Sequence, residues 1–445
     1  MLPRVTQSYA TLYTAWRRPP YGRTPEGWRF SDKVQGVDST TVARPEPPRS
    51  ERAASPASRA GAFAWRICLL AAPALLLLFV LACNGGGSSD GTGGAQATPT
   101  PLPTPTPFPG IGSEVAVPNA DFPVAMAFAP DGRLFYAERN TGNVRLVTAD
   151  GRLQKQPVLH VDVIANPAMP WGLVGLALDP AFEQNGFIYV FYTAPVDERR
   201  AQPKLARYTV AANRASKATV LMDDLPEAKL FSEYYVGGNI RFGPDGNLYV
   251  PIGDFDSTSN AKDLTSARGK VLRLNPQDGA AAVGNPFVGQ GDEDARIFAY
   301  GLLWPYDLSF RPRSGEMFLT ERGVYFCCDE LNLVRAGQNY GWGVAPDESV
   351  APVYNFAYPG QKPDGSKVYP TGLEFVSNEA YPALGDSLLV CEGTTHYMRR
   401  LVLNASSKVG SDDVILGDCQ LDIAADPNGV IYYSNETEIR RLVSR

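Results

Sequence analysis

A two-strand motif recurs along this chain and constrains its fold more than any other feature. Each copy has an alternating apolar segment, a tight turn and a second alternating segment. The alternation is the period of a half-buried strand, and the turn residues supply the positive φ that a hairpin needs. The turn is Pro-Asp-Gly or Pro-Asn-Gly in three copies and Pro-Arg-Ser-Gly in another. The clear copies occupy residues 124–138, 238–252, 306–321 and 421–434.

Two weaker copies, at 172–192 and 381–390, fill the gaps between the clear ones. Six hairpins then recur about every 55 residues, a spacing typical of propeller blades with four short strands each. A sandwich would not need internal repetition, and no segment has the sustained 3.6-residue period of a helical or βαβ fold. The sequence therefore predicts an all-β fold, a six-bladed β-propeller over residues 111–445.

The segments before the repeats are of another kind. Residues 1–65 are rich in Arg, Pro and Ser, so we expect disorder, or a translation start just upstream of Trp65. Residues 66–83 carry an apolar run of signal-peptide length. It ends in Val-Leu-Ala-Cys, which resembles a bacterial lipobox with Cys83 as the lipidated residue. The alternative is a plain membrane anchor.

A linker of two compositions follows the apolar run. Residues 84–94 are mostly Gly, Ser and other small or polar residues, and residues 98–110 read TPTPLPTPTPFPG. Alternating proline favours an extended polyproline II spacer, although a random linker at 84–110 would separate the parts equally well. We expect a lipid-anchored protein at the cell membrane, with its propeller on the extracytoplasmic side, where disulfides are permitted.

Charge and ligand counts exclude several functions. Residues 1–82 carry 11 Lys/Arg and 5 Asp/Glu, a charge of +6. The rest of the chain carries 30 Lys/Arg and 42 Asp/Glu, a charge of −12. A body of that charge is a poor nucleic-acid partner. The two histidines exclude a three-imidazole metal site, and the six cysteines form no Cys-x-x-Cys pair.

Four cysteines lie in the repeat region and allow three connectivities. A link between Cys391 and Cys419, a vicinal bond between Cys327 and Cys328, and mixed pairings all stay open.

A series of short segments carries a family resemblance. The segments are GLVGLALDPAF at 172–182, FGPDG at 242–246, GKVLR at 269–273, YGL at 300–302, DELN at 329–332 and NYGW at 339–342. In this order along about 110–445, they resemble the glucose/sorbosone dehydrogenase family, the soluble quinoprotein aldose sugar dehydrogenases. The resemblance implies pyrroloquinoline quinone (PQQ) and Ca²⁺ over the channel, and a His that takes the anomeric hydroxyl proton as hydride passes to the quinone.

The chain departs from this family pattern where the chemistry would occur. Tyr235 stands at the His position, and a phenol with a pKa near 10 is a poor base at neutral pH. Leu303 and Trp304 stand at the cofactor-binding Arg and Asn positions, which removes charge-assisted bonds to the quinone carboxylates. Trp304 could stack on a flat or sugar ligand, or simply fill space. These changes speak against PQQ.

The family's calcium loop is partly kept. The resemblance implies metal ligands at Gly323 and Asp329, and Ca²⁺ prefers six to eight oxygens. The alternative for Asp329 is a solvated turn carboxylate. Further candidate ligands at the channel mouth are His396, Asp254 and Tyr325, although Asp in such turns commonly binds its own backbone.

Three functions are therefore compatible with the sequence. The first is a divergent, non-catalytic or altered propeller that binds a sugar, a protein or a surface ligand. The second is an active quinone-dependent oxidoreductase acting on aldose sugars. The third is a Ca²⁺-dependent hydrolase or lactonase-like propeller.

Overall fold

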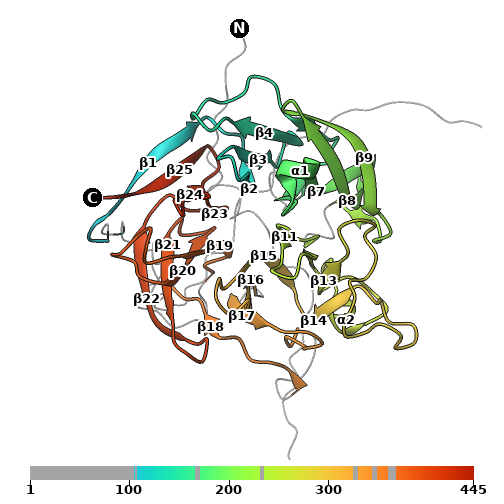
Figure 1. The fold of residues 1–445 in the computed structure, drawn as a ribbon. Coiled ribbons are helices and arrows are strands. Elements are labelled where there is room, and N and C mark those ends of the chain that lie inside the picture. The colour runs from blue at the N-terminus through green and yellow to red at the C-terminus, as the bar shows by residue number, and fades with distance from the viewer. Residues whose placement is uncertain are drawn as a thin grey trace, which may run out of the picture. The chain divides into compact units, whose positions relative to one another are not determined.

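The structure is a computed structural model that describes residues 105, 108–165, 171–230, 235–323, 329–342, 348–358 and 367–445. The strands of this part form six small antiparallel sheets arranged in a ring, as Figure 1 shows. This confirms the predicted six-bladed β-propeller. The described residues contain no helix that is both long and apolar enough to cross a membrane. The apolar run that ends at Cys83 lies outside the described residues.

The first three blades follow one another along the chain. Blade 1 consists of β2 (Pro123–Phe128), β3 (Leu134–Glu138), β4 (Asn143–Val147) and β5 (Leu159–His160). Blade 2 consists of β6 (Leu173–Leu178), α1 (Phe182–Asn185), β7 (Phe187–Asp197), β8 (Arg200–Ala211), β9 (Arg214–Met222) and β10 (Ala228–Lys229). Blade 3 consists of β11 (Arg241–Phe242), β12 (Leu248–Ile252), α2 (Thr258–Lys262), β13 (Lys270–Leu274) and β14 (Ile297–Tyr300).

The other three blades complete the ring. Blade 4 consists of β15 (Trp304–Phe310), β16 (Met317–Arg322), β17 (Glu330–Val334) and β18 (Tyr354–Asn355). Blade 5 consists of β19 (Pro370–Val376), β20 (Ser387–Glu392), β21 (Met398–Leu403) and β22 (Val409–Leu416). Blade 6 consists of β23 (Ile423–Ala425), β24 (Ile431–Ser434), β25 (Glu438–Ser444) and β1 (Ile111–Pro118).

Blade 6 joins the two ends of the repeat region. β1 is its outermost strand and lies antiparallel beside β25, so that Ile111 pairs with Ser444 and Pro118 with Glu438 (Figure 1). The ring is thus closed by hydrogen bonds between strands that are far apart in sequence, a common way to close a propeller.

The predicted hairpins form the inner two strands of the blades. In four of them the turn glycine has positive φ, for example 85° at Gly132 and 74° at Gly246. The fifth copy was misplaced: residues 381–390 cover the turn and most of β20, and its partner β19 begins at Pro370. β19 was missed because Pro370, Gly372 and a register shift between Pro370 and Leu373 break its alternation.

The hydrophobic core lies between neighbouring blades. Each of six clusters of buried side chains is shared by two adjacent blades, and the largest joins blades 2 and 3 around Trp171 and Phe191. Packing of this kind uses the faces of the sheets. The loops at the two ends of the ring therefore remain available for function.

A buried ion network connects the inner strands at the centre of the ring. Arg241 of β11 donates to Asp307 of β15 at 2.8 Å and to Asp422, just before β23, at 3.3 Å. Its guanidinium is also 3.8 Å from the Glu374 carboxylate of β19, and the Met126 N–H of β2 donates to Asp422 at 2.6 Å. Five of the six blades therefore meet in one network.

Candidate ligand site at the channel mouth

Four side chains from three blades meet where the inner strands begin and their partners end. Trp304 is the first residue of β15 and Arg322 the last of β16, and the two pair directly across the strands. Tyr235 lies shortly before β11, and Tyr369 immediately precedes β19. We call this end of the ring the channel mouth and these four residues the mouth cluster.

The mouth cluster is a cation packed against three aromatic rings. The rings of Tyr235 and Trp304 have centroids 5.0 Å apart and are inclined by 30°. The guanidinium carbon of Arg322 lies 3.7 Å from the ring centroid of Tyr369, 4.9 Å from that of Trp304 and 5.7 Å from that of Tyr235. Such contacts stabilise a cation through the negative faces of the rings.

Leu303 is held beside the cluster by its backbone. Its N–H donates to a carboxylate oxygen of Glu321 at 2.6 Å, and its carbonyl accepts the Asp254 N–H at 2.9 Å. The Leu303 side chain is apolar and only 5% exposed. It cannot offer a cation to a cofactor, and the cation that packs on the rings of the mouth cluster is Arg322.

Asp254 is buried and fully hydrogen-bonded. Its two carboxylate oxygens accept the Trp342 indole N–H at 2.7 Å and the Asp256 backbone N–H at 2.8 Å. Burial raises the pKa of Asp254 to about 6. The carboxylate therefore binds its own turn and ties blade 3 to Trp342.

Asp329 has backbone N–H groups around both oxygens. One oxygen accepts the Gly323 N–H at 3.1 Å, and the other accepts those of Val368 and Tyr369 at 2.7 and 2.9 Å. Burial raises its pKa, and at 3% exposure Asp329 is not the solvated carboxylate that we considered. Three donors directed at one carboxylate do not fit the predicted calcium role. They fix Tyr369 next to Arg322 instead.

The remaining predicted site residues do not join the cluster. His396 is exposed in the turn between β20 and β21, with φ of 59°, and its carbonyl accepts the Cys419 N–H at 3.0 Å. None of the contacts between described residues links its ring to the mouth cluster. Tyr325 and Cys83 lie outside the described residues.

One disulfide is present in the described part of the chain. It joins Cys391 at the end of β20 to Cys419, which precedes β23, and so connects blades 5 and 6. Cys327 and Cys328 lie outside the described residues.

The described residues do not fit the quinone in the manner that the resemblance implied. Leu303 removes a cation, and Tyr235 and Trp304 pack on each other with no space for a flat ring between them at 5.0 Å. The ring of Tyr235 also lies 5.7 Å from the guanidinium carbon of Arg322, next to a cation.

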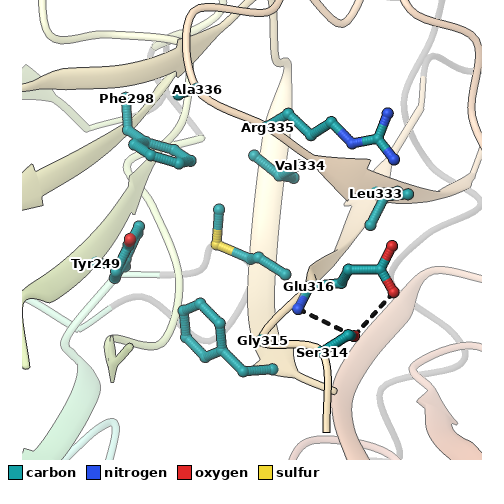
Figure 2. Close-up of a pocket in the computed structure, with 11 residues that line it drawn as sticks. Tyr249, Phe298, Ser314, Gly315, Glu316, Leu333, Val334, Arg335 and Ala336 are labelled. Atoms are coloured by element: carbon teal, nitrogen blue, oxygen red, sulfur yellow. Dashed lines mark hydrogen bonds between the residues drawn. The ribbon is translucent and has the colours of Figure 1, made fainter. Parts of the chain in front are cut away.

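The cavity in Figure 2 lies at the opposite end of the same hairpin. It measures about 280 Å³ and is lined by the turn between β15 and β16, where Ser314 donates to Glu316 at 2.9 Å. Tyr249 and Phe298 of blade 3 form its other wall. None of the predicted site residues lines this cavity.

Sequence reasoning identified half of the mouth cluster. It pointed to Tyr235 and Trp304 but missed Arg322 and Tyr369. Arg322 directly precedes the predicted calcium ligand Gly323, but its position opposite Trp304 follows from a strand pairing that includes a register shift between Pro305 and Asp307.

Comparisons with known proteins agree with this architecture. The family model for Glucose / Sorbosone dehydrogenase matches residues 120–444. The aldose sugar dehydrogenase YliI of Escherichia coli is 30% identical over 236 residues, 52% of this chain and 62% of that protein. Quinoprotein glucose dehydrogenase B of Acinetobacter calcoaceticus is 31% identical over 256 residues, 52% of each chain. Human Hedgehog-interacting protein is 29% identical over 210 residues, 41% of this chain and 29% of that protein.

Solved structures share the fold. The crystal structure of a glucose dehydrogenase-type oxidoreductase from Thermus thermophilus superposes with a TM-score of 0.65 at 29% identity, over 75% of this chain and all of that chain. Because the family model spans nearly the whole propeller, the chain belongs to the Glucose / Sorbosone dehydrogenase family.

Proposed function

We propose that the protein is a divergent family member that binds a sugar at the channel mouth without the quinone-dependent dehydrogenase reaction. The packing of Tyr235, Trp304 and Arg322 carries the proposal. This contact fills the place where the family resemblance puts a base and a cofactor. A sugar can still lie against aromatic faces at the mouth.

The relatives leave two classes of function to weigh. Two are named as sugar dehydrogenases, and another is named for its interaction with a protein. Substitution of both the base and the cofactor cation favours binding over turnover, because a positioned base alone contributes roughly 10²–10⁴-fold.

The decisive experiment combines thermal melting and dye reduction on the full-length chain. PQQ with Ca²⁺ should leave the melting midpoint unchanged, because a ligand stabilises only what it binds. Dye reduction with aldoses should be at background. A matched variant, Tyr235→His with Leu303→Arg, restores the family residues and should gain a PQQ-dependent shift. Turnover by the unaltered protein would establish the dehydrogenase function instead.

We further propose that Cys83 anchors the protein to the membrane through lipid, with the propeller on the extracytoplasmic side. The lipobox-like segment supports this, and the Cys391–Cys419 disulfide is compatible with an oxidising compartment. The unaltered protein should partition into the detergent phase, and Cys83→Ala should keep the uncleaved leader. Cleavage that is unaffected by the substitution would contradict the proposal.

A further inference from the structure

The mouth cluster contains two buried donors for which the described part of the chain offers no acceptor. Among the described residues, the indole nitrogen of Trp304 and Nε of Arg322 are buried and have no hydrogen-bond partner. Trp304 is 9% exposed. A buried donor without an acceptor has lost its hydrogen bonds to water without replacement, and native proteins rarely contain such a group. Two such donors on residues that pair directly across the strands indicate that an acceptor binds here.

The guanidinium of Arg322 forms no direct ion pair with the other described residues, although its charge opposes the burial that raises the pKa of Asp329. None of the ion pairs or hydrogen bonds between these residues includes its guanidinium, which instead packs on Tyr369 and Trp304. The neighbouring acid, Asp329, is already engaged by three backbone N–H groups. A mobile anion would therefore complete the site.

A second positive charge, that of Lys367, adds to the charge of Arg322. Burial and the charge of Arg322 lower the pKa of Lys367, so the two cations lie close enough to act on each other. The body of the chain is acidic overall, so this positive spot is a local exception.

We propose that Arg322 and Trp304 bind the carboxylate of an acidic sugar, a uronate, at the channel mouth. A guanidinium presents parallel N–H donors that match a carboxylate, and the indole N–H adds a third donor. Tyr235 and Tyr369 offer apolar faces to the sugar ring. The inference rests on the proposed sugar-binding function and names its ligand class.

The test is calorimetric titration of the full-length chain at low ionic strength. The probes are sodium D-galacturonate and D-glucuronate, with D-galactose and D-glucose as neutral matches. The uronates should bind at least about tenfold more tightly than the neutral sugars, because a hydrogen bond to a charged group is stronger than one between neutral groups.

Variants assign the effect to the two donors. Arg322→Gln should lower uronate affinity about tenfold or more, a larger factor than for the neutral sugars. Arg322→Lys should recover part of it, because it keeps the charge without the fork. Trp304→Phe keeps a ring and removes the N–H, so it should weaken uronate binding by a smaller factor. The control is Arg207→Gln, which removes a guanidinium packed 4.5 Å from the Phe187 ring in blade 2. Melting curves show which variants fold.

The outcomes separate this inference from the proposed function. Equal affinity for uronates and neutral sugars, uronate binding indifferent to Arg322→Gln, or no binding of either uronate would overturn the inference. Arg322-dependent binding of PQQ without uronate binding would assign the site to a quinone carboxylate and also overturn it. Dye reduction, measured separately, decides the proposed function.

Discussion

Asp329 shows how one carboxylate can shape a site without touching a ligand. Its oxygens accept hydrogen bonds from the backbone N–H groups of Gly323, Val368 and Tyr369. These bonds join the end of β16 to the start of β19. Tyr369 is held with a φ of 54°, a conformation that an ordinary side chain adopts only when its surroundings enforce it. Asp329 is thus a positioning residue for the Tyr369–Arg322 contact.

Replacing Asp329 by Asn tests that role. The amide keeps one acceptor but turns an NH₂ toward a backbone donor, so the free energy of unfolding should fall by about 1–3 kcal/mol. Urea denaturation measures the change. The control is Asp150→Asn, an exposed turn carboxylate, whose replacement should leave the urea midpoint essentially unchanged. An unchanged variant, with wild type stabilised by added Ca²⁺, would restore the calcium role.

We also expect the free energy of unfolding to depend on pH through a single residue, Asp254. Its folded pKa of about 6 lies above the ordinary 3.8, so its contribution to stability is complete below about pH 4 and is lost as pH rises to 6. The variant Asp254→Asn has no carboxyl group at this position, so it does not lose this stability as the pH rises. The free energy of unfolding of the variant relative to wild type should therefore rise between pH 4 and 6, by on the order of 1–3 kcal/mol. A pH-independent difference would contradict the raised pKa.

At the scale of elements, the sequence predicted hairpins well and side-chain partners poorly. Glycine at the turns and alternating residues are local signals, so five of the six hairpins were placed correctly. The pairing of Trp304 with Arg322 depends on a register shift between Pro305 and Asp307, and the position of Tyr369 depends on Asp329. Both depend on contacts that no local pattern records, which is why half of the mouth cluster was missed.

The disulfide between blades 5 and 6 gives an element-scale prediction. Cys391 and Cys419 are 28 residues apart, and closing a loop of that length stabilises the fold by about 2–4 kcal/mol. Reduction should lower the melting midpoint of the wild type. The double variant Cys391→Ala/Cys419→Ala should melt lower without reductant and show no further decrease with it. A further decrease would assign the effect to other cysteines.

At the scale of the whole molecule, the Arg241 network ties the blades at the centre of the ring. Burial raises the pKa of Asp422 and Glu374, whereas the charge of Arg241 lowers both. The arginine therefore opposes the uptake of protons that burial favours at both acids.

Arg241→Met should be among the most damaging single changes. It leaves buried carboxylates without their cation, which costs about 3–5 kcal/mol at pH 7. The loss should shrink near pH 4.5, because the acids protonate more easily once the arginine is gone. Denaturation at both pH values measures it. Arg200→Met, which removes exposed ion pairs to Asp197 and Glu227, should have a far smaller effect than Arg241→Met. Equal losses for Arg241→Met at the two pH values would contradict the account.

The seam between β1 and β25 governs how the molecule is completed during synthesis. β1 emerges from the ribosome more than 300 residues before the strand that it pairs with. Until then the nascent chain carries an unpaired strand, the kind of surface to which other chains add. The hairpins within each blade can form earlier, because their contacts are local in sequence. The newly synthesised protein therefore pairs β1 only when the ring is completed, and not when any single blade folds.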